Sequence, residues 1–276
     1  MRHRLLTLNV HSQPDAASDG EAVLALCELF GRLRPTVVAL QEVCQSRGAE
    51  LLSESPLGYR AAEPTAVLRR DLFVLRLSRA LAELGLWYEW SYLPIKLGYG
   101  KYDEGVALLS SEPISETETL TVSRTAEYRS WKTRRLLGAH IGGAWFYSVH
   151  FGWYEDPEEP FSEQWARALR GFGRHPCEPI YLLGDFNSPA EAEGGGYDLV
   201  TKSGYFDAWS LAGGREGATV LGAVDGWEKN GARGLRIDHI RSSRPFSGGW
   251  ACRVLDGKQG PVISDHFGVY AEIEGG

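Results

Sequence analysis

Polar side chains recur in this sequence at the ends of short apolar segments that are typical of buried strands. They are Asn9, Glu42, His150, Asp185 and Asn187, together with Asp265 and His266, which stand directly before the last such segment. Charged and amide groups at strand ends gather at the rim of a sheet, where the sites of α/β proteins commonly lie. Five such places in one chain therefore predict a functional site at one sheet rim.

The chemistry that these residue types favour is phosphoryl transfer at a divalent metal ion. Asn9, Glu42 and Asp265 offer hard oxygen ligands. Such ligands suit Mg²⁺ or Mn²⁺, because these ions keep several waters and bind phosphate oxygens. Asp185 could hold and polarise the water that attacks phosphorus. The sequence therefore predicts a metal-dependent hydrolase that acts on phosphate esters.

Histidines and an amide complete the predicted site. Pairing of His266 with Asp238 would orient the imidazole and stabilise its charged form. Asn187 and His150 could donate hydrogen bonds to the non-bridging phosphate oxygens while negative charge builds up there. The sequence does not decide whether His11 belongs to the site or to the scaffold.

The elements that would position these residues are mostly strands. Apolar runs at 5–10 and 36–40 predict buried strands on either side of a helix, which begins at a capping box over 18–21 and ends near Arg34. Further strands are predicted at 105–110, 134–141, 145–150, 180–184, 236–241 and 268–273, and helical spacing recurs at 66–84 and 161–169. Because strands outnumber helices, we expect an α/β protein with two packed sheets and helices outside.

Composition limits the partners and the compartment. The 276 residues contain no internal repeat or linker, which predicts one domain over 1–276, and the formal net charge of -7 argues against a stable nucleic-acid partner. No apolar run approaches the ~18 residues of a membrane span, and the first ten residues lack a signal-peptide pattern. The four cysteines form no CxxC pair. We therefore expect a cytoplasmic protein that needs no membrane.

Seven short segments resemble the ordered motifs of the endonuclease/exonuclease/phosphatase superfamily, which includes DNase I-like nucleases, apurinic endonucleases and inositol-polyphosphate 5-phosphatases. They are TLNVH (7–11), QEV (41–43), EGVALLS (104–110), SVH (148–150), GDFN (184–187), RIDHI (236–240) and SDHFGV (264–269). The resemblance covers nearly the whole chain. It implies a four-layer α/β sandwich, with two packed mixed β-sheets flanked by helices and the site at one rim.

The resemblance also implies roles for individual residues. Asn9 and Glu42 would bind the metal, with Asp265 as a further ligand or a water-mediated partner. Asp185 would activate the nucleophile, and His266 would be the general base or the histidine that stabilises the phosphate.

Two more candidates come from the resemblance alone. Glu104 occupies the place where many members put a carboxylate beside the residue that matches His150. Arg134 or Arg135 matches the phosphate-binding arginine, and Arg134 is favoured. Position 11 is His where apurinic-type nucleases carry Asp, which leaves a second metal position open.

A narrower likeness concerns the substrate. The segments at 98–110, 129–138, 146–165, 225–227 and 262–269 are similar to the bacterial maltose 6′-phosphate phosphatases, and HFGWYEDPEEPFSEQW (150–165) is the most distinctive of them. Trp153 and Trp227 offer flat apolar faces for sugar rings, although tryptophan more often packs in a core, and Lys132 could clamp a phosphate. A nuclease would more often interleave aromatic residues with Lys and Arg.

These observations leave three hypotheses in order of preference. The first is a sugar-phosphate phosphatase that uses Mg²⁺ or Mn²⁺ and acts on a disaccharide phosphate such as maltose 6′-phosphate. The second is a phosphodiesterase or nuclease with the same catalytic residues. The third, a binding module without activity, conflicts with the intact set of site residues. Walker A, HExxH and GxSxG motifs are absent from the sequence, which excludes the classes that depend on them.

Overall fold

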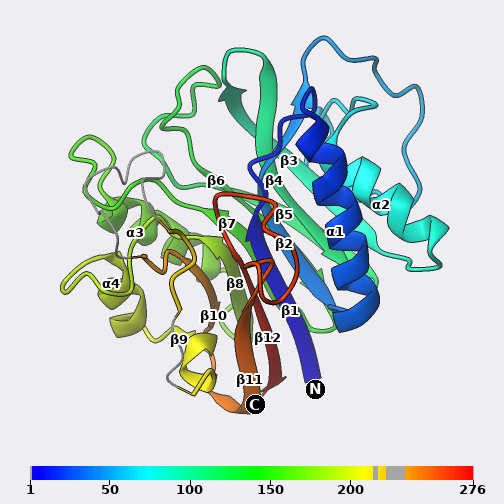
Figure 1. Cartoon of the computed structure of the whole chain (residues 1–276). Helices are drawn as coiled ribbons and strands as arrows, with labels where there is room; N and C mark the ends of the chain where they lie inside the picture. Colours follow the sequence, from blue (N-terminus) through cyan, green and yellow to red (C-terminus); the bar gives the residue numbers. More distant parts are fainter. Residues whose placement is uncertain (1, 214–216, 222–233, 276) are drawn as a thin grey trace.

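The computed structural model of the chain describes residues 2–213, 217–221 and 234–275 (Figure 1). The strands are β1 (Arg2–Asn9), β2 (Val37–Ser46), β3 (Glu89–Gly98), β4 (Tyr102–Ser110), β5 (Ile114–Thr121), β6 (Arg135–Ile141), β7 (Ala144–His150), β8 (Ile180–Asp185), β9 (Phe206–Asp207), β10 (Asp238–Ser242), β11 (Phe246–Val254) and β12 (Gly268–Gly275). The helices are α1 (Ala17–Leu33), α2 (Phe73–Glu83), α3 (Phe161–Phe172), α4 (Gly196–Lys202) and the short 3-10 helix η1 (Ala208–Leu211).

The strands form two mixed six-stranded sheets. The first sheet has the order β11-β12-β1-β2-β4-β3, and the second has the order β5-β6-β7-β8-β10-β9. β1 and β2 are parallel, as are β7 and β8, and all other neighbouring strands are antiparallel. The predicted strand-helix-strand unit at the start of the chain is therefore present as β1, α1 and β2.

Helices cover the outer face of each sheet, α1 and α2 on the first and α3 on the second (Figure 1). Alternation along the strands explains why both faces are apolar. In β1, Leu6 and Leu8 pack among residues of α1 and α2, whereas Leu5 packs between the two sheets. The result is the four-layer sandwich that the sequence predicts.

A buried polar bridge joins the two sheets close to their common rim. The Thr7 hydroxyl lies 3.2 Å from Gln41 Oε1, and Gln41 Nε2 donates to Ser148 Oγ at 3.0 Å. Ser148 Oγ in turn donates to the carbonyl of Leu40 at 3.1 Å. Because every member of this bridge has a partner, it fixes the relative position of β1, β2 and β7 without the penalty of unpaired polar groups.

Some sequence predictions of the fold are incomplete or wrong. β3, β5, β9 and β11 are missing from the prediction, as are α4 and η1, and the helix expected within 66–84 begins only at Phe73. The predicted capping box is wrong, because the N-cap of α1 is Ala16 and makes no side-chain cap bond. Asp19 accepts instead from the backbone N–H of Gln13 and pairs with Arg76, which ties α1 to α2.

No helix in the described ranges is long and apolar enough to cross a membrane. All four cysteines are free thiols.

Candidate active site

The strands bring most of the predicted residues together between the two sheets at one rim. Asn9 lies four residues after Leu5 in β1, and side chains alternate between the two faces of a strand. The Asn9 side chain therefore faces the second sheet, as that of Leu5 does. In that sheet, His150, Asp185 and Asp238 are direct neighbours across β7, β8 and β10. Polar residues thus replace the apolar inter-sheet core where the strands end.

Asp185 is the centre of this cluster. Its Oδ2 atom lies 3.3 Å from Asn9 Nδ2, 3.6 Å from His150 Nε2 and 4.0 Å from His266 Nε2. Its Oδ1 atom accepts a hydrogen bond of 2.8 Å from the backbone N–H of Asn187. The carboxylate is therefore held from three sides, and residues of both sheets contribute to its position.

Asn187 owes its place to an unusual backbone conformation. Its φ of 45° lies in the left-handed region, which Asn tolerates better than most residues. The turn lets its side-chain amide donate to the carbonyl of Phe151 at 3.0 Å and approach Asp185 Oδ2 at 3.4 Å. The amide can therefore meet a phosphate oxygen bound next to Asp185.

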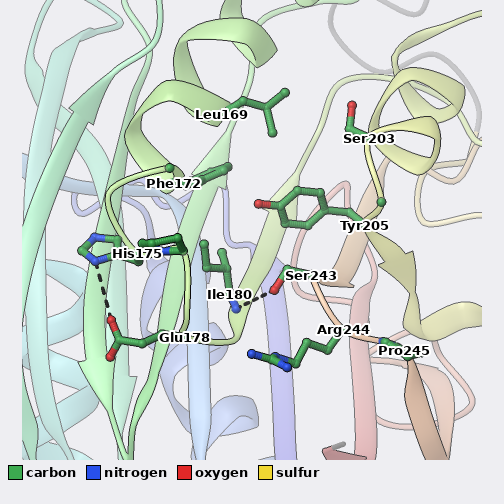
Figure 2. A pocket seen from close by; sticks show the side chains of 13 residues that line it. Leu169, Phe172, His175, Glu178, Ile180, Ser203, Tyr205, Ser243, Arg244 and Pro245 are labelled. Atoms are coloured by element: carbon green, nitrogen blue, oxygen red, sulfur yellow. Dashed lines mark hydrogen bonds and ion pairs between the residues drawn. The ribbon is translucent and has the colours of Figure 1, made fainter.

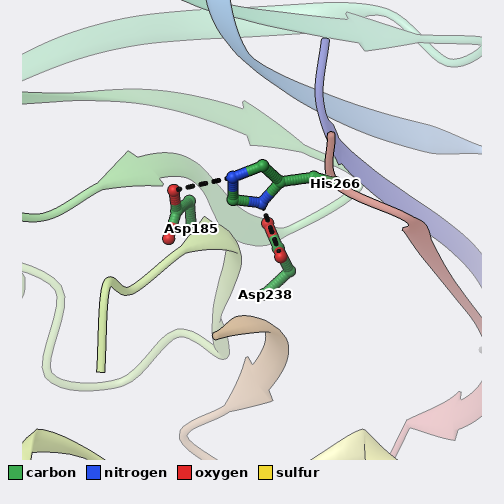
Figure 3. Close-up of side chains that lie close together, drawn as sticks. All are labelled: Asp185, Asp238 and His266. Atoms are coloured by element: carbon green, nitrogen blue, oxygen red, sulfur yellow. Dashed lines mark hydrogen bonds and ion pairs between the residues drawn. The ribbon is translucent and has the colours of Figure 1, made fainter. Parts of the chain in front are cut away.

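His266 is held between two aspartates from the opposite sheet (Figure 3). Its Nδ1 atom lies 2.9 Å from Oδ2 of Asp238, and its Nε2 atom faces Asp185. Burial disfavours the imidazolium, but the charge and hydrogen bond of Asp238 outweigh it and raise the pKa of His266 to about 10. At neutral pH His266 is therefore a cation whose Nε2 atom faces Asp185.

Burial also changes the acidity of Asp185 and His150. Burial and the negative charge of Asp238 raise the pKa of Asp185 to about 7. Burial and the guanidinium of Arg134 lower the pKa of His150 well below its usual range, so this imidazole is neutral. A carboxylate that titrates near neutrality is suited to accept a proton from water.

A second group of acids lies beside Asn9. Glu42 Oε1 accepts from Asn9 Nδ2 at 2.9 Å, while His11 Nδ1 lies 3.2 Å from Glu42 Oε2 and 3.7 Å from Asp265 Oδ1. Glu42 reaches this place because a bulge interrupts β2 between Leu40 and Val43, and its own φ is 50°. The left-handed conformation is strained for a glutamate and marks a position that the surrounding structure enforces.

These acids fit a divalent cation. The hydrogen bond with Glu42 raises the pKa of His11 to about 9, so a positive charge already sits between Glu42 and Asp265. The carboxylates therefore favour a cation, and they are hard oxygen donors of the kind that Mg²⁺ and Mn²⁺ prefer. The Asn9 amide nitrogen faces Glu42 and Asp185, so this amide has to turn over to offer its oxygen.

A different set, Asp185, Asp238 and His266, also has ligand atoms within 4.8 Å of one another and could hold a metal ion. In this set His266 Nδ1 lies 2.9 Å from Asp238 Oδ2, so the histidine and one of the two carboxylates are already paired with each other. We therefore interpret this set as a charge-paired histidine, and the group around Glu42 as the better cation site.

Arg134, Glu104 and His150 meet on the other side of the cluster, around a small cavity of about 10 Å³. The Arg134 guanidinium is buried, its Nη1 atom donates to the carbonyls of Trp131 and Thr133, and its Nε atom has no hydrogen-bond partner within the described ranges. Arg135 points elsewhere and pairs with Glu63. The structure therefore brings Arg134, and not Arg135, to the site.

None of the three predicted substrate residues Lys132, Trp153 and Trp227 is placed at this cluster by the described part of the chain. Lys132 Nζ is 2.9 Å from Asp156 Oδ2 and 2.8 Å from Glu158 Oε2, so its charge is already engaged by the loop that follows β7. Trp153 is partly buried and packs against the small cluster of Val220 and Ile237. Trp227 lies outside the described residues. The role of all three in substrate binding stays a prediction.

Two residues of the site were missed from the sequence. Lys96 lies 3.0 Å from Glu104 and lines the same cavity as Arg134. A lysine within the apolar run SYLPIKLG is a weak signal that could have been followed. Ser264 donates to the Asn9 carbonyl at 2.7 Å and accepts from the His266 backbone N–H at 3.2 Å, so it ties the two motifs together.

A second cavity, of about 750 Å³, opens at the opposite end of the second sheet (Figure 2). Ile180, the first residue of β8, lines it, whereas Asp185 is the last residue of that strand. Ser243 Oγ accepts from the Ile180 backbone N–H, and His175 faces Glu178 (Figure 2). This cavity is separate from the cluster around Asp185.

Known structures share this fold along the whole chain. An endonuclease/exonuclease/phosphatase family protein from Leptotrichia buccalis is 24% identical, with a TM-score of 0.85, and the match covers 99% of this chain and 100% of that one. The 3′ phosphatase NExo from Neisseria, bound to a product DNA hairpin, is 18% identical, with a TM-score of 0.63 and coverage of 99% and 100%. Truncated TDP2 from Caenorhabditis elegans is 16% identical, with a TM-score of 0.60 and coverage of 100% and 98%.

No curated protein sequence matches the chain. The sequence profile of the endonuclease/exonuclease/phosphatase family matches residues 6–266, a range that holds every candidate site residue described above. The chain therefore belongs to the endonuclease/exonuclease/phosphatase family.

Proposed function

We propose that this protein is a divalent-metal-dependent phosphatase that hydrolyses the phosphomonoester of a sugar, with a disaccharide phosphate such as maltose 6′-phosphate as the preferred substrate. The observation that carries the proposal is the buried guanidinium of Arg134. No carboxylate oxygen within the described ranges lies within 4.0 Å of it. A buried cation without an anionic partner is costly, and a phosphoryl group bound beside Asp185 would be its partner.

The residues around Asp185 can perform the hydrolysis. The carboxylate of Asp185 accepts a proton from a water molecule, whose oxygen attacks phosphorus while the bond from phosphorus to the sugar oxygen breaks. The sugar oxygen takes up a proton from solvent and leaves as a hydroxyl group. His266 and Arg134 then stabilise the negative charge on the phosphoryl oxygens, and Asn187 adds a neutral donor. A divalent ion held by Glu42, Asp265 and Asn9 would supply further charge stabilisation at this centre.

The surface next to Arg134 supports a substrate with a sugar ring. Trp131, whose carbonyl accepts from Arg134, exposes 61% of its surface. An exposed indole beside a phosphate site can stack on the apolar face of a sugar ring. The formal net charge of -7 favours a small substrate over a polyanion, so we propose no stable nucleic-acid partner.

A phosphodiesterase or nuclease remains the second candidate. One similar structure, a 3′ phosphatase, is bound to a DNA hairpin product, which keeps nucleic acid open as a substrate, and the same central residues would serve the hydrolysis of a diester. A diester carries one negative charge, whereas a monoester carries up to two. The two cations Arg134 and His266 at one centre therefore favour the monoester.

A phosphate-release panel tests the proposal. It compares maltose 6′-phosphate, trehalose 6-phosphate, glucose 6-phosphate, a 3′-phosphorylated DNA hairpin and, with release of 4-nitrophenol as its readout, the diester bis(4-nitrophenyl) phosphate, each with Mg²⁺, Mn²⁺ or EDTA. We expect metal-dependent release that is fastest from a disaccharide phosphate and absent in Asp185→Ala. Cleavage of the diester alone would move the function to the second candidate, whereas release from the DNA hairpin alone would keep a phosphomonoesterase and overturn the sugar substrate.

A further inference from the structure

Lys96, which lies outside the family motifs, forms a buried ion pair with Glu104. It stands opposite Glu104 across β3 and β4, and its Nζ atom lies 3.0 Å from Glu104 Oε1. Only 12% of the Lys96 side chain and 9% of the Glu104 side chain are exposed. This pair lines the same small cavity as Arg134 and His150, so its charges act directly on the site.

Glu104 is thus the carboxylate that two buried cations can share. Its charge acts on both Lys96 and Arg134, yet the ion pair that it forms within 4.0 Å is with Lys96. The planar fork of an arginine fits a carboxylate through two parallel hydrogen bonds, which makes Arg134 a strong competitor for Glu104. Something must therefore keep Glu104 away from Arg134.

The backbone of β3 helps to hold Glu104 on the Lys96 side. A Cβ atom added at Gly98 would lie 2.6 Å from Glu104 Oε2 and 3.0 Å from Glu104 Cβ. The missing side chain of Gly98 therefore leaves the space into which the Glu104 carboxylate turns. With Lys96 bound to one oxygen and Gly98 beneath the other, Glu104 lies against β3.

We propose that Lys96 is a positioning residue, which holds Glu104 and so keeps the Arg134 guanidinium open for the phosphoryl group of the substrate. This inference rests on the proposed function, because it concerns how the site binds a phosphate ester. Without Lys96, Glu104 would turn to Arg134 and compete with the substrate for the guanidinium.

Orthophosphate binding tests this proposal without relying on turnover. Calorimetry with Mg²⁺ present would compare the wild type with Lys96→Met, Glu104→Gln, the double variant Lys96→Met/Glu104→Gln and Arg134→Met. We expect Lys96→Met to weaken phosphate binding at least about tenfold, the scale of one charge-assisted hydrogen bond. The double variant should bind like Glu104→Gln alone, because a neutral amide competes poorly for the guanidinium.

The variants separate the positioning role of Lys96 from the proposed function of the site. Two results would overturn the positioning role of Lys96. The first is an unchanged phosphate affinity in Lys96→Met, and the second is a double variant that binds phosphate as weakly as Lys96→Met does. Binding that does not depend on Arg134 would overturn the proposed function itself. Should Lys96→Met fail to fold, Glu104→Gln alone decides: removing the competitor should leave phosphate affinity at or above that of the wild type, and a loss of affinity would contradict the proposal. In turnover, Lys96→Met should raise KM more than it lowers kcat.

Discussion

His266 and Asp238 form a buried ion pair that crosses from one sheet to the other, with Nδ1 of the histidine 2.9 Å from Oδ2 of the aspartate. His266 stands just before β12 of the first sheet, and Asp238 begins β10 of the second. The same contact therefore joins the two sheets and keeps a positive charge next to Asp185.

Replacing Asp238 with Asn should lower the pKa of His266 markedly from about 10. Because the folded-state pKa exceeds the usual value of 6.5, the pair stabilises the fold fully below about pH 6.5 and this contribution is lost as pH rises through 10. Asp238→Asn should lower the free energy of unfolding at pH 7 by about 3 kcal/mol. NMR titration of His266 measures the change in pKa, and denaturant unfolding measures the change in free energy of unfolding. A His266 pKa that is unchanged in Asp238→Asn would contradict the pairing of His266 with Asp238.

The acid limb of the pH profile should report Asp185. Since burial and Asp238 raise the pKa of this carboxyl to about 7, kcat/KM is expected to fall as pH drops below neutrality, where Asp185 becomes protonated. A bound divalent cation would shift this limb to lower pH, because it favours the carboxylate. Asp185→Asn should reduce kcat by about 10²-fold or more and abolish the limb. If Asp185→Asn keeps the acid limb of the kcat/KM profile, the limb belongs to another group.

Arg134 and Arg135 provide a matched pair of variants. Arg134→Met should raise KM for the phosphate ester strongly, because the guanidinium at the site is lost. Arg135→Met should leave KM close to that of the wild type, since Arg135 pairs with Glu63. That pair is partly exposed, so its loss should cost at most about 1 kcal/mol of stability. Steady-state kinetics and thermal unfolding distinguish the two residues, and equal KM values would contradict the placement of Arg134.

Metal affinity should depend on Glu42. Glu42→Gln is expected to weaken Mg²⁺ binding at least about tenfold, because a charged oxygen ligand is lost. Glu28→Gln serves as the control, since Glu28 is an exposed residue of α1. Calorimetric titration with Mg²⁺ measures both variants. If both bind the ion as the wild type does, the cation site lies elsewhere, and the cluster of Asp185, Asp238 and His266 becomes the alternative.

Strand parity explains why much of the site could be predicted from the sequence. Asn9 and Asp185 end strands whose inward residues include Leu5 and Leu183, so alternation alone places both side chains between the sheets. The choice between Arg134 and Arg135 could not be made in this way, because it depends on Glu63, which lies far away in the chain.

Other features require the folded backbone. Glu42 reaches Asn9 only through the bulge in β2 and its left-handed φ, and a strand pattern gives no sign of either. The contact of Lys96 with Glu104 depends on the register of β3 against β4, and the sequence does not predict β3. Packing between distant segments decides such contacts, whereas local sequence patterns specify the strands that carry them.

The most direct test of the central claim is the release of orthophosphate from maltose 6′-phosphate by the purified protein. The measurement compares Mg²⁺ with EDTA for the wild type, and the wild type with Asp185→Asn. A metal-dependent phosphomonoesterase predicts release with Mg²⁺, none with EDTA, and a decrease of about 10²-fold or more in the variant. Release that persists in EDTA, a rate in Asp185→Asn close to that of the wild type, or no release from any sugar phosphate offered with metal would contradict the account.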